Sequence, residues 1–192
     1  MKSTGYIALF VGLLFLTATV TFATGSGLIR AFFIDGNPNK TSLIMGVLLE
    51  IACGIAVVGI GALMFPILKM FNKKLALGYL VFRIIELAII IGGGMYILFL
   101  LKLMLKYEMI LFLFTGFGGL IFSYLLFQSQ IVPRLLSILG IIGYATLSVG
   151  VLLDILGYFY MNSNTGMLFY IPGGLFELFL PVWLFIKGFD VK

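Results

Sequence analysis

Residues 75–101 read LALGYLVFRIIELAIIIGGGMYILFLL, an almost wholly apolar run that holds one arginine, Arg83, and one glutamate, Glu86. A helix needs roughly 20 consecutive apolar residues to cross the hydrocarbon core of a bilayer, and this run is longer. Charge in hydrocarbon is costly, so such residues usually face the interior of a helix bundle. The stretch therefore predicts a membrane-spanning helix whose polar side chains turn toward other helices.

Five more apolar runs of comparable length occur along the chain, separated by short segments rich in turn-forming polar residues. The predicted spans are 5–29, 42–68, 75–101, 109–127, 135–160 and 167–186, and the clearest connectors are 35–41, 72–74, 128–130 and 162–166. We predict an all-α integral membrane protein, a bundle of six transmembrane helices with short loops. Residues 1–192 are expected to form a single domain.

Composition limits the classes of partner and of chemistry. Hydrophobic residues make up 62% of the chain and charged residues 10%, which leaves too little polar surface for a soluble domain. The net charge of +5 is spread over the loops without a basic patch, so no nucleic acid partner is expected. The expected partners are membrane lipids and a small-molecule or lipid ligand, and the oligomeric state stays open.

Histidine is absent and the single cysteine, Cys53, lies in an apolar run. These two facts exclude a disulfide framework, zinc sites built on histidine, haem with histidine ligands and Ser–His or Cys–His nucleophiles. We predict no cofactor and no metal site. An enzyme is the weaker alternative, because it would need two carboxylates to act as acid and base on a lipid substrate.

The first apolar run also has features of a secretory signal, since Lys2 precedes it and small residues follow near Ala23 and Gly25. The run is longer than the roughly 7 to 15 residues of a signal h-region, which favours a retained span. Thr17, Thr21 and Thr24 recur at helical spacing. They predict a polar stripe buried against other spans.

Loop lysines and arginines predict the orientation in the membrane. With the N-terminus inside, seven basic residues fall on the cytoplasmic side and four outside. The inner set is Lys2, Lys69, Lys73, Lys74, Arg134, Lys187 and Lys192, and the outer set is Arg30, Lys40, Lys102 and Lys106. Both termini are therefore expected in the cytoplasm.

The candidate binding residues are the ionisable side chains inside the predicted spans: Glu50, Arg83, Glu86, Asp154 and Glu177. Small residues share a helix face with several of these acids, as Gly46 does with Glu50 and Gly173 with Glu177. Small residues let neighbouring helices approach closely in membranes. The acids are therefore expected to face protein or a cavity.

Two readings of this set remain open. In the first, Arg83 is paired by Glu86, Glu177 or both, and the charges only hold the third and sixth spans together in a structural or partner-binding subunit. In the second, the protein binds or moves a small molecule, lipid or ion: Arg83 holds an anionic group or balances the acids, or Glu50, Asp154 or Glu177 carries a proton. Four acids against one arginine favour the second reading.

Several motifs resemble those of one known family. They are Arg83-Ile-Ile-Glu86 after the 75–79 segment LALGY, the Pro133-Arg134 connector, and Glu177 followed by the 182–188 segment VWLFIKG. Together the motifs resemble the family of bacterial membrane proteins known as domain of unknown function 4386. The resemblance implies a multi-pass protein of the bacterial inner membrane and no established activity. It also implies that Arg83, Glu86, Pro133, Arg134 and Glu177 occupy characteristic positions.

Overall fold

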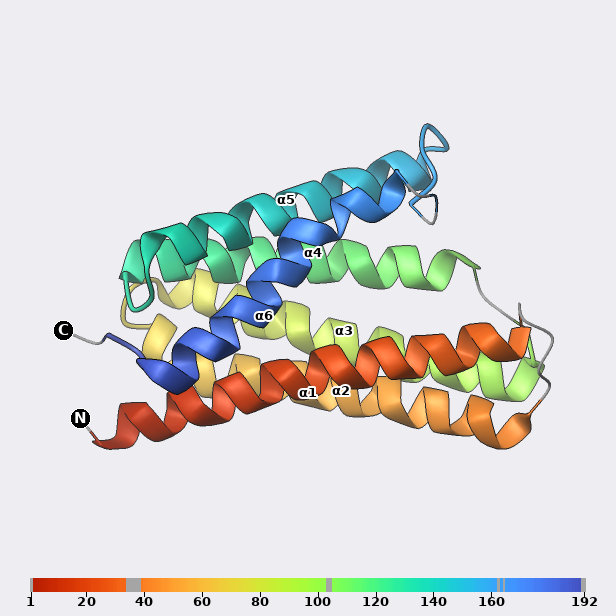
Figure 1. The fold of residues 1–192 in the computed structure, drawn as a ribbon, viewed down its shortest axis with the longest axis horizontal. Helices are drawn as coiled ribbons and strands as arrows, with labels where there is room; N and C mark the ends of the chain where they lie inside the picture. The colour runs from red at the N-terminus through yellow and green to blue at the C-terminus, as the bar shows by residue number, and fades with distance from the viewer. Residues whose placement is uncertain (1, 34–38, 103–104, 162, 164, 191–192) are drawn as a thin grey trace.

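A computed structural model describes residues 2–33, 39–102, 105–161, 163 and 165–190, and over these ranges the fold is helical, without strands. The elements are α1 (Lys2–Phe33), α2 (Lys40–Leu68), α3 (Lys73–Leu100), α4 (Leu105–Ser129), α5 (Arg134–Ile155), the short 3-10 helix η1 (Gly166–Phe169) and α6 (Ile171–Ile186) (Figure 1). Six segments are long and apolar enough to cross a membrane. The predicted all-α membrane bundle is confirmed.

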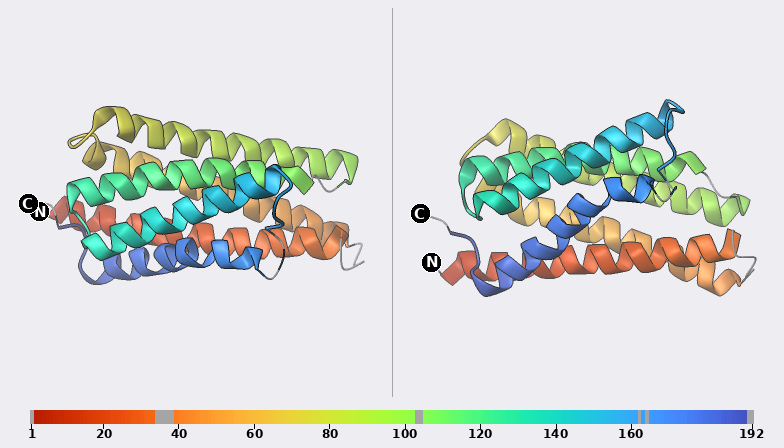
Figure 2. Two further views of the ribbon diagram at one scale, coloured as in Figure 1. Left: turned by 90° about the horizontal axis from the view of Figure 1, so that it is seen from above. Right: turned by 45° about the horizontal axis from the view of Figure 1, so that its top comes forward.

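The six helices form a closed ring. Each α-helix contacts the next along the chain, and α6 returns to pack against α1. The chain runs up and down, so that its two termini lie at the same end of the bundle, here called the terminal end; the opposite end is called the far end (Figures 1 and 2). This arrangement encloses an interior that every helix can reach.

Asparagine caps begin two of the helices. The Asn39 side chain accepts a hydrogen bond from the backbone N–H of Thr41 at 3.0 Å, and Asn72 accepts one from Leu75 at 3.1 Å. Such side chains satisfy backbone donors that a helix start leaves unpaired. The connector predicted at 72–74 is thus the turn that starts α3, whereas those at 35–41 and 162–166 lie partly outside the described residues.

The fifth helix is shorter than predicted. It ends at Ile155 and not at residue 160, and Gly157 follows with a φ of 78°. The backbone N–H of Met161 donates to Asp154 Oδ2 at 2.6 Å, which folds the chain back over the end of α5. Apolar composition alone extended the predicted span, because Leu156 to Tyr160 contain no charged residue and are mostly apolar or aromatic.

Glycines set the closest helix contacts. A Cβ atom on Gly25 of α1 would lie 2.8 Å from the carbonyl oxygen of Gly46 in α2. One on Gly143 of α5 would lie 2.5 Å from the backbone nitrogen of Gly173 in α6. Close backbone approach at small residues is typical of helix interfaces in membranes. The glycines beside Glu50 and Glu177 therefore pack helices together, as their spacing predicts.

The predicted threonine stripe on α1 is wrong. Thr17 and Thr24 are exposed on the outer surface of the ring, and Thr21 Oγ1 donates to the carbonyl oxygen of Thr17 at 2.7 Å. A threonine hydroxyl that bonds the preceding turn of its own helix needs no partner from another helix. Spacing alone therefore does not show that a threonine stripe is buried.

We expect Gly143→Ala to lower the free energy of unfolding by about 1 to 3 kcal/mol, because the added methyl group forces α5 away from the backbone of Gly173. Circular dichroism during denaturant titration in detergent measures the change. Gly92→Ala is the matched control, since a Cβ atom there meets nothing within 4 Å. Equal stability of the two variants would contradict the proposed backbone contact.

Candidate functional site

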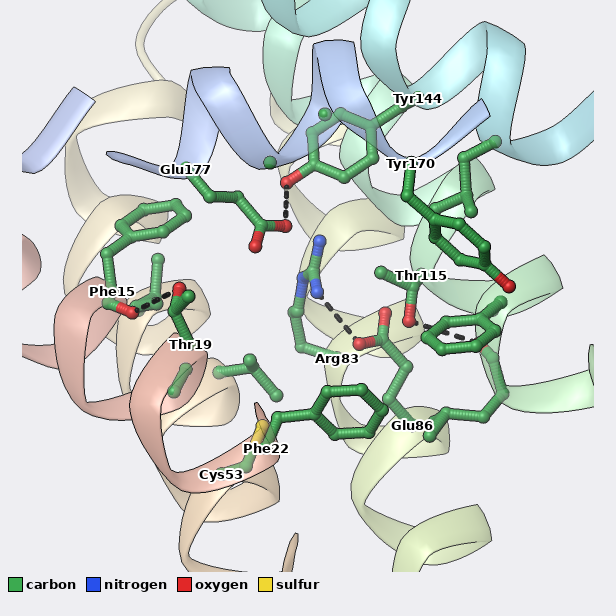
Figure 3. Close-up of a pocket in the computed structure, with 18 of the residues that line it drawn as sticks. Phe15, Thr19, Phe22, Cys53, Arg83, Glu86, Thr115, Tyr144, Tyr170 and Glu177 are labelled. Carbon is green, nitrogen blue, oxygen red and sulfur yellow. Dashed lines mark hydrogen bonds and ion pairs between the residues drawn. The ribbon is translucent and has the colours of Figure 1, made fainter. Parts of the chain in front are cut away.

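A cavity of about 270 Å³ lies inside the ring, and all six helices contribute to its wall (Figure 3). Most of the wall is apolar and aromatic, but three charged side chains reach it: Arg83, Glu86 and Glu177. The other lining residues are Phe15, Ala18, Thr19, Phe22, Ala23, Cys53, Val57, Ile60, Tyr79, Ile90, Leu111, Phe112, Thr115, Tyr144, Leu147, Tyr170, Gly173 and Gly174. Charged groups gathered in an apolar cavity mark the candidate binding site.

Arg83 and Glu86 form an ion pair within α3. Arg83 Nη1 donates to Glu86 Oε2 at 2.8 Å, and the two side chains are only 6% and 3% exposed. The guanidinium carbon also lies 5.1 Å from the centre of the Tyr79 ring, in cation–π geometry. Glu86 lies three residues after Arg83 on the same helix. It therefore balances the charge of Arg83 without linking α3 to another helix.

A glycine on α4 makes room for this pair. Gly118 faces it so closely that a Cβ atom would lie 3.3 Å from Glu86 Oε1 and 3.6 Å from Arg83 Nη2. Glu86 Oε1 and Arg83 Nε are buried and have no hydrogen-bond partner within the described part of the chain. The pair therefore keeps unused hydrogen-bonding capacity beside the cavity.

Glu177 approaches the same cavity from α6. Its Oε1 accepts a hydrogen bond from the Tyr144 hydroxyl at 2.9 Å, and its side chain points toward Arg83 (Figure 3). Among the residues the structure describes, however, no cation lies within ion-pair distance of Glu177. Arg83 is balanced by Glu86, so Glu177 is the carboxyl group of the site that has no cationic partner among the described residues.

The two other predicted site residues lie elsewhere. Glu50 is buried in α2 and accepts a hydrogen bond from the Tyr107 hydroxyl at 3.1 Å. Asp154 holds the turn after α5 through the backbone N–H of Met161. The structure thus brings together Arg83, Glu86 and Glu177 and leaves Glu50 and Asp154 outside the cavity wall.

Sequence reasoning missed the tyrosines of the site. Tyr79 lies four residues before Arg83, so helical spacing could have placed its ring beside the guanidinium. No local pattern pairs Tyr144 with Glu177, because these residues lie on different helices and meet only in the folded bundle. The described residues contain no group of three or more His, Cys, Asp or Glu side chains placed to hold a metal ion.

Six apolar helices around a cavity with a buried ion pair define a multi-pass membrane protein. The chain belongs to the family described as Domain of unknown function (DUF4386), whose model matches residues 10–109 and 98–188. The family resemblance of the sequence motifs is thereby confirmed. No match was found among curated proteins or among solved structures.

Replacing the two acids of the cavity, Glu86 and Glu177, should have different effects on the free energy of unfolding. We expect Glu86→Gln to lower the free energy of unfolding by about 3 to 5 kcal/mol, because it leaves the buried charge of Arg83 unpaired. We expect Glu177→Gln to leave stability unchanged or raise it, since glutamine can still accept from Tyr144 and the uncompensated charge is gone.

Thermal unfolding of both variants in the same detergent measures this difference. Glu108→Gln is the control, because Glu108 lies 3.8 Å from a partly exposed Arg30. Such a pair contributes about 0 to 1 kcal/mol. A large loss of stability in Glu177→Gln would show that this acid holds the helices together.

Proposed function

We propose that the protein binds a small organic molecule with a positively charged group, and that Glu177 is the counter-charge for that group. One observation carries the proposal: Glu177 faces an apolar cavity and has no cation partner among the described residues. A carboxylate withdrawn from water is costly unless a cation or several donors satisfy it. A bound cation would supply the missing partner.

The remaining charges of the site support a cationic ligand over an anionic one. Glu86 Oε2 lies 2.8 Å from Arg83 Nη1 and already balances the charge of the guanidinium. An anion bound at the donors of Arg83 that stay free would therefore add a further negative charge beside Glu86 and Glu177. With Glu177 ionised, the three charged side chains sum to one negative charge. Electrostatic complementarity therefore favours a ligand with one positive charge.

Aromatic side chains around the cavity suit the same ligand. Phe15, Phe22, Phe112 and Tyr170 contribute rings to the wall. An ammonium group over an aromatic face gains about 0.5 to 2 kcal/mol, the larger value applying where water is excluded. The ammonium group of an alkylamine could thus pair with the carboxylate of Glu177, and its methylene groups could pack against the aromatic rings.

The volume limits the size of the ligand. Ligand pockets commonly measure about 300 to 1,000 Å³, and the cavity of about 270 Å³ lies just below that range. The site suits a compact amine or the head of a larger molecule.

A structural role is the second candidate, and the contact between Tyr144 and Glu177 favours it because it joins α5 to α6. In that case Glu177 would be retained for helix packing. The stability of Glu177→Gln separates the two candidates, since the proposed binding role requires that this substitution does not destabilise the bundle.

We expect n-hexylamine to raise the melting temperature of the wild-type protein in detergent, whereas hexanoate at the same concentration does not. At 100 times the dissociation constant a ligand stabilises the folded state by about 2.7 kcal/mol. Glu177→Gln should abolish the shift. An equal shift in this variant, or a larger shift with hexanoate, would refute the role of Glu177 as counter-charge.

We also propose that both termini are cytoplasmic, from the distribution of loop lysines and arginines. The proposal that the membrane is the inner membrane of a bacterium rests on the family resemblance alone. Of the residues that carry the proposed orientation, Lys192 and the side chains of Lys2 and Lys106 lie outside the described part of the chain. Cleavage of a C-terminal tag by protease in intact cells would contradict this orientation, and cleavage only after lysis would support it.

A further inference from the structure

We propose that the ligand reaches the cavity sideways from within the bilayer, between α1 and α6, and is therefore an amphiphile. Its amine head lies beside Glu177 and its hydrocarbon chain extends through the opening toward the lipid. This inference rests on the proposed function, because it assigns the ligand class and the route to the same cavity.

We place the opening where α1 and α6 diverge, because the close contacts that their glycines define lie toward the terminal end. There, a Cβ atom on Gly12 would lie 2.7 Å from the Phe185 ring, and one on Gly188 would lie 3.9 Å from Ala8. Toward the far end α6 leaves α1 and packs on α5, where Gly173 meets Gly143 (Figures 1 and 2). The two helices thus diverge along their length.

Two residues of the cavity wall are classed as exposed, Ala23 on α1 and Gly174 on α6. Space remains beside them, since a Cβ atom on Gly174 meets nothing within 4 Å. Glu177 lies three residues further along α6, on the same face of the helix. The uncompensated carboxylate is therefore the first charged group inside the opening.

The depth of the opening places it in the hydrocarbon layer. Ala23 lies four residues beyond the centre of the span Gly5–Phe33, and Gly174 two residues from the centre of Gly166–Ile186. At about 1.5 Å per residue, these offsets are about 6 Å and about 3 Å toward the far end. Both are well inside a hydrocarbon core about 30 Å thick.

The rim of the opening is apolar. Val20 on α1 and Ile171, Leu175 and Leu178 on α6 are all exposed large hydrophobic side chains. A hydrocarbon chain can rest against such a rim without loss of hydrogen bonds, whereas a hydrated ion would lose its water there. This chemistry selects a ligand that is already dissolved in the membrane.

Cys53 is the natural probe for this route, because it is the only cysteine of the chain and lines the cavity. In phosphatidylcholine nanodiscs, N-ethylmaleimide should label Cys53, as measured by intact mass. A sulfonated maleimide that does not enter the bilayer should label it about tenfold more slowly or not at all. Equal rates for the two reagents would overturn lateral access.

Substitution at the opening tests its position. Gly174→Leu should slow labelling by N-ethylmaleimide about tenfold, because leucine at an uncrowded position narrows the opening without overpacking the helices. Gly27→Leu is the matched control, since Gly27 also has nothing within 4 Å of its Cβ position and does not line the cavity. Equal rates in both variants would overturn the assigned opening.

Ligand protection tests the chemical class. Dodecylamine should slow labelling of the wild type about tenfold when the site is about 90% occupied, whereas propylamine at the same concentration should slow it less than about twofold. Equal protection by both amines would overturn the membrane route but leave the proposed function intact. Protection by neither, with no stabilisation by hexylamine, would show that the proposed function itself fails.

The amine head could belong to a free single-chain amphiphile or to an aminophospholipid. Nanodiscs that contain phosphatidylethanolamine distinguish the two sources. Slower labelling there, with no added amine, would support lateral access by a membrane lipid. Unchanged labelling, together with protection by dodecylamine, would support a free amphiphile. Labelling accelerated by dodecylamine in wild type but not in Glu177→Gln would overturn the assigned binding of the head group.

Discussion

The ion pair between Arg83 and Glu86 is the constraint on which the rest of the interior depends. A guanidinium inside a membrane bundle needs an immediate counter-charge, and α3 supplies one from its own next turn at 2.8 Å. The helices around it must then accommodate two long polar side chains. Tyr79 offers its ring to the guanidinium, and Gly118 keeps α4 from crowding the carboxylate. The cavity lies where this ion pair meets the aromatic side chains of the other helices.

The self-contained pair also defines the role of the remaining acid. If Arg83 had been shared between two glutamates on different helices, the ion pairs would have linked those helices to α3. Glu177 receives a neutral donor, Tyr144, in place of a cation. The site therefore combines an ion pair whose charges balance with one carboxyl group that has no cationic partner among the described residues. That division, and not the number of buried charges, is the basis of the proposed binding role.

Much of the fold followed from simple physical patterns. Long apolar runs predicted six spans within a few residues, because hydrocarbon thickness fixes their length. The prediction was wrong at the end of α5. There the helix stops and a hydrophobic turn follows, which Asp154 holds through its hydrogen bond from Met161. Within the site, one of the two readings of the sequence included a pair between Arg83 and Glu86, and their spacing of three residues on one helix explains the contact. The partner of Glu177 could not be predicted, because Tyr144 reaches it only through the packing of α5 on α6. Glu50 and Asp154 share the sequence signature of the site residues, yet the structure gives each a separate partner.

The closure of the ring has a consequence for assembly during synthesis. The first and last of the six helices, α1 and α6, are neighbours, so the wall of the cavity stays incomplete until the last helix leaves the ribosome and enters the bilayer. Until then, the side of the bundle that α6 will cover faces lipid, but Arg83 already has its counter-charge in Glu86. A pair within one helix is available as soon as α3 is inserted. The pairing within α3 thus allows this charged helix to stay in the membrane before α6 is inserted and completes the wall around it.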